Sequence, residues 1–102
     1  MPDIPELSNI RETIDGIDNR ILDLLAERSR VVAKVAILKT ELGMQAHQPD
    51  RFGALKERLH ALAAQQGLDP ALIDGVWGAI HDSSLAQQTA PAPSPISEPF
   101  SR

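Results

Sequence analysis

The sequence predicts an all-α protein, a three-helix chain with one long and two shorter helices that forms an intertwined homodimeric helical bundle. Apolar residues recur at alternating steps of three and four, and no segment has the period of two that indicates a strand. All 8 prolines lie outside residues 6–43, so that stretch can form one continuous helix. At 102 residues the chain has room for a single domain, and the scarcity of aromatic residues (3%) predicts an aliphatic core.

The long helix is predicted over residues 6–43. Gly16 costs about 1 kcal/mol relative to alanine but does not end a helix, whereas Gly43 suits the position just after a helix end. Isoleucine, leucine and valine fill its heptad positions, which are Ile10, Ile14, Ile17, Ile21, Leu24, Val31, Val35 and Leu38. This spacing is the seam along which one helix packs on another.

Two shorter helices are predicted after it. The second begins near Pro49, ends at Gly67 and places Phe52 and Leu55 on its apolar seam. Asp69 is then an N-cap, followed by proline at the first helical position of the third helix, which must stop before Pro91. We therefore expect a helical domain over residues 1–88 and a disordered Pro/Ser-rich tail over residues 89–102.

The length of the first helix predicts the dimer. Two helices of roughly 18 residues reach about 27 Å each, whereas a helix of roughly 35 residues is about 50 Å long. The shorter helices of one chain therefore cover only part of the apolar seam. Because an exposed apolar stripe marks an interface, we expect the long helices of two chains to pack together.

Composition excludes several classes of function. The net charge is −4 with no Lys/Arg cluster, which argues against a nucleic-acid or membrane-surface binder. The absence of cysteine excludes disulfides, thiolate zinc sites, iron–sulfur clusters and thiol nucleophiles. No long apolar run or signal peptide is present, so we expect a cytoplasmic protein. Because no metal-ligand spacing is present either, we expect a protein that needs no metal or cofactor. The three histidines are irregularly spaced and predict surface residues: His47, His60 and His81.

Cationic side chains interrupt the apolar faces. Arg11, Arg28 and Lys39 share one stripe of the first helix, and Arg51 precedes the apolar seam residue Phe52. Such side chains either extend to solvent beside acidic partners or line an interior pocket. The pocket would bind a compact polyanion such as a dicarboxylate, because arginine binds carboxylates with two hydrogen bonds. A site without nucleophile or metal would catalyse by positioning and electrostatics.

The third helix carries polar residues where its apolar seam should continue. Extending the seam of Ile73, Val76 and Ile80 leads to Ser83 and Gln87, which either face the same pocket or lie in solvent at the helix end. The neighbouring pair, one residue further along, is the alternative: Ser84 and Gln88.

Over residues 7–88 the sequence resembles the all-helical chorismate mutases and the related isochorismate-pyruvate lyases. The resemblance rests on short motifs in order, at Ile10-Arg11, Ile17-Asp18, residues 24–28, Val35, Lys39, Asp50-Arg51, residues 67–69 and residues 82–88. It implies an intertwined dimer that rearranges chorismate to prephenate without a covalent intermediate or a cofactor. Active sites would be shared between the two chains.

The resemblance also implies roles for single residues. Arg28 and Arg51 of one chain and Arg11 of its partner would anchor the substrate carboxylates, and Ser83 would support one of them. Lys39 and Gln87 would donate hydrogen bonds to the ether oxygen, where negative charge develops as the C–O bond breaks. The residues expected to be catalytic are therefore Lys39, Gln87 and Arg28.

Two substrate-binding positions depart from the family pattern. At the position of Phe52, mutases commonly carry a glutamate that accepts a hydrogen bond from the ring hydroxyl of the substrate. At the position of Gln48 they commonly carry an aspartate. An apolar residue at the first position is similar to the lyases, which form salicylate, and also suits a mutase of 4-amino-4-deoxychorismate. A catalytically inactive helical dimer serving as an interaction module is the non-enzyme alternative. Residues 82–88 are closer to mutase usage and favour the chorismate mutase.

Overall fold

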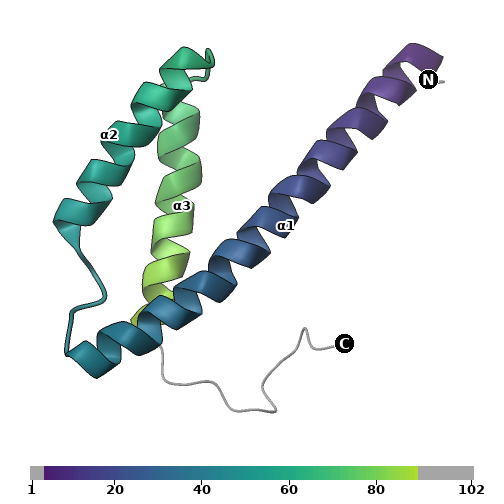
Figure 1. Ribbon diagram of the computed structural model, residues 1–102. Coiled ribbons are helices and arrows are strands. Elements are labelled where there is room, and N and C mark those ends of the chain that lie inside the picture. Colours follow the sequence, from purple (N-terminus) through teal and green to yellow (C-terminus); the bar gives the residue numbers. More distant parts are fainter. Residues whose placement is uncertain (1–3, 90–102) are drawn as a thin grey trace, which may run out of the picture. The chain divides into compact units, whose positions relative to one another are not determined.

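The computed structural model describes residues 4–89, and these form three helices and no strand (Figure 1). The helices are α1 (Pro5–Leu42), α2 (Pro49–Gln65) and α3 (Pro70–Thr89). They confirm the predicted all-α class with one long and two shorter helices. The tail was expected over residues 89–102. Thr89 is the last residue of α3, and residues 90–102 lie outside the described part of the chain.

The chain forms two units, Met1–Val31 and Val32–Arg102. The described residues of the first unit are the N-terminal part of α1, a single helix. The second unit holds the remainder of α1 together with α2 and α3. Since α1 contains no buried residue, the packed interior of the described chain belongs to the second unit.

The C-terminal end of α1 is fixed by a glycine in the left-handed conformation. Gly43 has φ 70° and follows Leu42, the last helical residue. The Met44 N–H donates to the Lys39 carbonyl at 2.8 Å, and the Gly43 N–H donates to the Thr40 carbonyl at 3.2 Å. These two bonds are the Schellman motif, which satisfies the last carbonyls of a helix. They confirm the predicted end and hold the backbone of Lys39.

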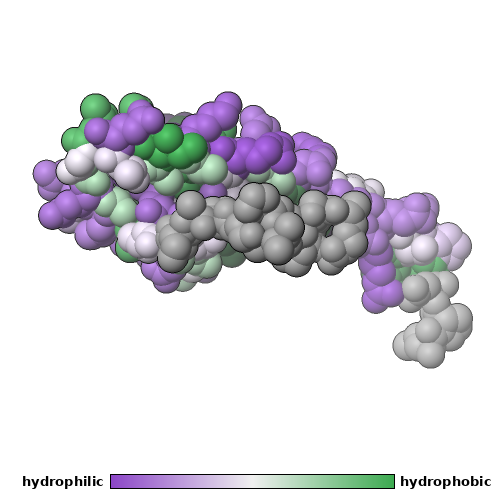
Figure 2. Space-filling view, turned by 90° about the horizontal axis from the view of Figure 1, so that it is seen from below, coloured by the Kyte–Doolittle hydropathy of each residue, from purple (hydrophilic) through white to green (hydrophobic). Residues whose placement is uncertain are grey.

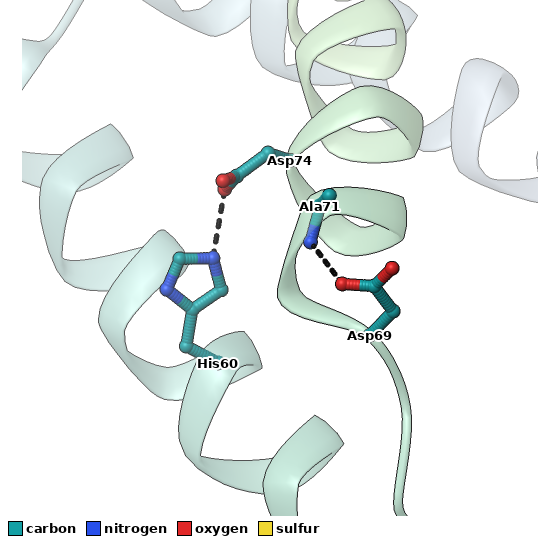
Figure 3. A network of polar contacts seen from close by, with 4 residues as sticks. All are labelled: His60, Asp69, Ala71 and Asp74. Atoms are coloured by element: carbon teal, nitrogen blue, oxygen red, sulfur yellow. Dashed lines mark hydrogen bonds and ion pairs between the residues drawn. The ribbon is translucent and has the colours of Figure 1, made fainter.

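The connection between α2 and α3 contains a second glycine in the left-handed conformation, followed by a carboxylate that caps α3. Gly67 has φ 72°, and the Leu68 N–H donates to the Ala63 carbonyl at 2.9 Å. Asp69 then accepts a hydrogen bond from the Ala71 N–H on Oδ1 at 2.9 Å (Figure 3). A carboxylate at this position satisfies a backbone donor that the helix cannot pair, so the predicted N-cap is confirmed.

Helices α2 and α3 pack side by side (Figure 1). The buried hydrophobic residues of the described chain are Leu55, Ala63 and Ile73, which come from these two helices. At their surface His60 Nε2 lies 2.7 Å from Asp74 Oδ1 (Figure 3), and both side chains are substantially exposed (39% and 50%). An exposed pair of this kind contributes little stability, so apolar packing holds the two helices together.

The heptad seam of α1 reaches the surface of the single chain. Its exposed fractions range from 38% at Val35 to 63% at Leu24. Ile10, Ile14, Ile17, Ile21, Val31 and Leu38 lie between these values. Figure 2 shows apolar residues, in green, reaching the surface among hydrophilic ones. Among the described residues, no helix combines the length and hydropathy needed to cross a membrane.

Candidate active site

Lys39 joins three segments of the second unit. It lies in the last turn of α1, and its side chain is half-buried. Its Nζ donates to Gln88 Oε1 of α3 at 2.8 Å and to the carbonyl of Ala46, between α1 and α2, at 2.9 Å. Short bonds from an ammonium group to two acceptors hold the charge in place. The structure thus brings the predicted cation together with an amide 49 residues further along the chain.

The face of α3 that meets Lys39 includes Gln88. The heptad pattern through Val76 predicts Gln87 there, with Gln88 as its alternative, and the hydrogen bond favours the alternative. Burial gives the physical reason: Val76 is 40% exposed, whereas the next residue, Trp77, is half-buried. Steps of four and three from Trp77 lead to His81, Ser84 and Gln88, all of which are half-buried. Ser83 is exposed and Gln87 is half-buried, and their contact with substrate stays a prediction.

The start of α2 holds the three other site residues predicted in this unit. Gln48 is at the N-cap position, where its side chain makes no cap bond and its Nε2 donates to the Gln45 carbonyl at 2.9 Å. Arg51 is exposed, and Phe52 is half-buried. The arginine therefore presents its charge to solvent, while the following ring turns toward the interior.

A stack of rings connects α2 to α3. The rings of Phe52 and His81 lie parallel, 3.8 Å apart between centroids with an interplanar angle of 14°. His47 meets His81 edge-on at 5.4 Å, and Lys56 Nζ lies 5.6 Å from the Phe52 centroid. His81 was predicted to be a surface residue, but it is half-buried between two rings. Its spacing of four from Trp77 was the signal that could have identified it.

A hollow of about 460 Å³ lies beside this cluster. It is formed by the segment between α1 and α2 and by the last turns of α3, and its lining consists of Gln45, Ala46, His47, Asp82, Leu85, Ala86 and Thr89. The lining residues that belong to α3 lie on the face next to that of His81 and Gln88. Within residues 4–89 no group of three or more His, Cys, Asp or Glu side chains could hold a metal ion.

The two remaining predicted residues belong to the first unit. Arg11 is exposed and Arg28 is half-buried on α1. Of the predicted site residues, the second unit by itself therefore supplies the Lys39 ammonium, which is hydrogen-bonded to the Gln88 amide, the exposed guanidinium of Arg51 and the ring of Phe52 stacked on His81. This set can hold an anionic group and hydrogen-bond an oxygen atom, but it offers no cysteine nucleophile.

Comparison with known proteins identifies a family to which the chain is similar. The family model of chorismate mutase type II matches residues 10–89. A chorismate mutase of Methanocaldococcus jannaschii is 38% identical over 66 residues, which are 65% of this chain and 67% of that protein. A 4-amino-4-deoxychorismate mutase of Streptomyces venezuelae is 29% identical over 75 residues, 74% of this chain and 73% of that protein.

Longer proteins also match. The T-protein of Enterobacter agglomerans is 34% identical over 73 residues, 72% of this chain, but the match spans only 20% of that protein. No solved structure gives a significant match. Nearly all the helical part of the chain therefore lies inside one family match, which includes Lys39, Phe52 and Gln88.

Proposed function

This chain belongs to the chorismate mutase type II family, and we propose from this premise that it converts chorismate to prephenate. In this rearrangement the ether C–O bond of the enolpyruvyl group breaks while a C–C bond forms to the ring. No group is transferred and no outside atom is consumed. The observation that carries the proposal is the Lys39–Gln88 hydrogen bond of 2.8 Å, which places a cation and an amide at one point.

This pair suits an oxygen atom that gains negative charge. Because Gln88 accepts from Lys39 on Oε1, its NH₂ group is the part of the amide that can donate to a substrate. The ammonium of Lys39 carries three donors and can turn one of them to the same oxygen. Donors fixed beforehand around developing charge stabilise the transition state more than the ground state. No covalent intermediate and no cofactor are needed.

Guanidinium groups would hold the two carboxylates of the substrate. Arg51 and Arg28 would act in the site of their own chain, and Arg11 would reach in from the partner chain. Ser84, on the α3 face of Gln88, would support a carboxylate in place of Ser83. Gln48 and Phe52 would lie at the ring of the substrate. Bidentate pairing of arginine with carboxylate fixes orientation as well as charge, so the substrate would be held in a compact conformation.

The site shared between chains rests on the proposed homodimer. The apolar heptad seam of α1 is exposed in the single chain, and Ile10 and Ile14 lie within one helical turn of Arg11. Pairing two such helices would remove this stripe from water, which is favourable in proportion to the apolar area buried. The same packing would bring the N-terminal part of one α1 to its partner.

Product analysis tests the function. The purified chain is incubated separately with chorismate, isochorismate and 4-amino-4-deoxychorismate, and the products are identified. We expect prephenate from chorismate. Salicylate and pyruvate from isochorismate alone would replace the proposal with a lyase, and turnover of the amino compound alone would replace it with the amino mutase. If none is converted and none shifts the melting temperature, the chain is an inactive helical dimer. The family match and the mutase names of its relatives favour the first outcome.

The hydrogen bond between Lys39 and α3 predicts which of two neighbouring glutamines acts on the ether oxygen. Gln88→Ala is expected to lower kcat for the rearrangement about 100-fold, because it removes one of two donors to the ether oxygen. Gln87→Ala is the matched control, an identical truncation of the neighbouring residue, and is expected to lower kcat by much less. Steady-state kinetics of both variants would check this. A larger loss in Gln87→Ala would assign the site to the heptad pattern through Ser83 instead.

A further inference from the structure

His81, which stacks on Phe52, has no role in the mechanism above. Both rings are half-buried, their planes are nearly parallel, and their centroids are 3.8 Å apart. His47 lies against His81 with an interplanar angle of 63°. Two neighbouring rings limit the orientations that the imidazole can adopt. A side chain fixed in this way can direct its nitrogen atoms to one place.

The stack lies two helical turns from the Lys39–Gln88 pair along α3. His81 and Gln88 are seven residues apart, so they share a face and are separated by about 10 Å along the helix axis. Phe52 directly follows Arg51, one of the proposed carboxylate anchors. In chorismate the ring hydroxyl is on the carbon next to the one that carries the ether oxygen. A His81 side chain that extends along this face toward Gln88 can therefore meet the hydroxyl while the Lys39–Gln88 pair holds the ether oxygen.

The imidazole of His81 can form the hydrogen bonds that the ring of Phe52 cannot. A phenyl ring can neither donate nor accept an ordinary hydrogen bond, and a hydroxyl left unpaired in a site is costly. Stacking covers a face of the imidazole and leaves its edge, which carries both nitrogen atoms. A neutral imidazole offers one donor and one acceptor, as a hydroxyl does. His81 can therefore pair with a substrate hydroxyl beside a phenylalanine that cannot.

We propose that His81, oriented by Phe52, hydrogen-bonds the ring hydroxyl of the substrate and determines specificity at that ring position. The proposal rests on the proposed function, since it assigns a further residue to that same site. His81 acts by positioning the ring, whereas Lys39 and Gln88 act on the ether oxygen. The substituent of the ring is thus recognised from α3 instead of from the residue after Arg51.

The test replaces His81 with phenylalanine, which keeps a stacking ring and removes both nitrogen atoms. Two substrates are compared: chorismate, and the analogue in which hydrogen replaces the ring hydroxyl. We expect His81→Phe to lower kcat/KM about 10- to 100-fold for chorismate, the cost of an unpaired hydroxyl, while kcat/KM for the analogue stays near that of the unmodified chain. His60→Phe is the matched control, because His60 contacts Asp74 outside the stack. It should leave the ratio of the two values unchanged.

A second variant keeps the result decisive if His81→Phe alters packing. Phe52→Glu in the His81→Phe background offers a carboxylate acceptor to the hydroxyl and is expected to recover chorismate turnover selectively. Equal losses with both substrates, or no loss with either, would overturn the assignment of His81. If the unmodified chain converts neither compound, the proposed function itself fails, so the two failures are distinguishable.

Discussion

Replacing Lys39 with alanine is expected to lower kcat for the rearrangement about 100- to 1,000-fold, the loss that follows removal of a preorganised donor to developing negative charge. Lys39 is held at 2.8 Å from Gln88 and at 2.9 Å from the Ala46 carbonyl, so its ammonium is in place before the substrate arrives. Its truncation should affect kcat more than KM, because the arginines hold the carboxylates in the ground state. Steady-state kinetics would check this.

The control for Lys39→Ala is Lys34→Ala, the same truncation at an exposed lysine of the same helix. Circular dichroism and the oligomeric state of both variants should match those of the unmodified chain, since neither lysine belongs to the apolar heptad seam of α1. Lys39→Arg keeps the charge and should recover activity only in part, because a planar guanidinium cannot reproduce the contacts of an ammonium. Normal kcat in the alanine variant would refute electrostatic catalysis by this residue.

The helix ends could be predicted because single residues specify them. Gly43 and Gly67 have the positive φ that a Schellman motif requires, and Asp69 caps the helix that follows. These signals act within a few residues of the chain and need no tertiary contact. The long α1 followed in the same way from the absence of proline.

The site could be predicted only in part, because it depends on which face of α3 meets α1. A single helix with Val76 and Trp77 both apolar supports two adjacent seams, and the sequence pattern favours the seam through Val76, which leads to Gln87. Burial in the folded chain favours the other seam, because the Trp77 side chain is half-buried whereas Val76 is 40% exposed. That choice turns Gln88 toward Lys39. It also places His81 on Phe52, a contact between helices that no local spacing in either helix specifies.

The second prediction with a large effect concerns sites shared between chains. Arg11→Ala and Arg28→Ala are each expected to be nearly inactive, because each variant lacks one carboxylate anchor in both sites of its dimer. In a dimer of one Arg11→Ala chain and one Arg28→Ala chain, one site would have both arginines and the other neither. Differently tagged chains allow this mixed dimer to be isolated, and its activity should be about half that of the unmodified dimer.

A reciprocal mixture separates this arrangement from its alternative. A dimer of one unmodified chain and one chain with both substitutions should be nearly inactive, because each of its sites receives one arginine and lacks the other. If both arginines served the site of their own chain, that mixed dimer would keep half of the activity, and the dimer of single variants would keep almost none. The two mixtures therefore give opposite results under the two arrangements. Partial unfolding of a variant cannot imitate this reversal, because both mixed dimers carry the same two substitutions.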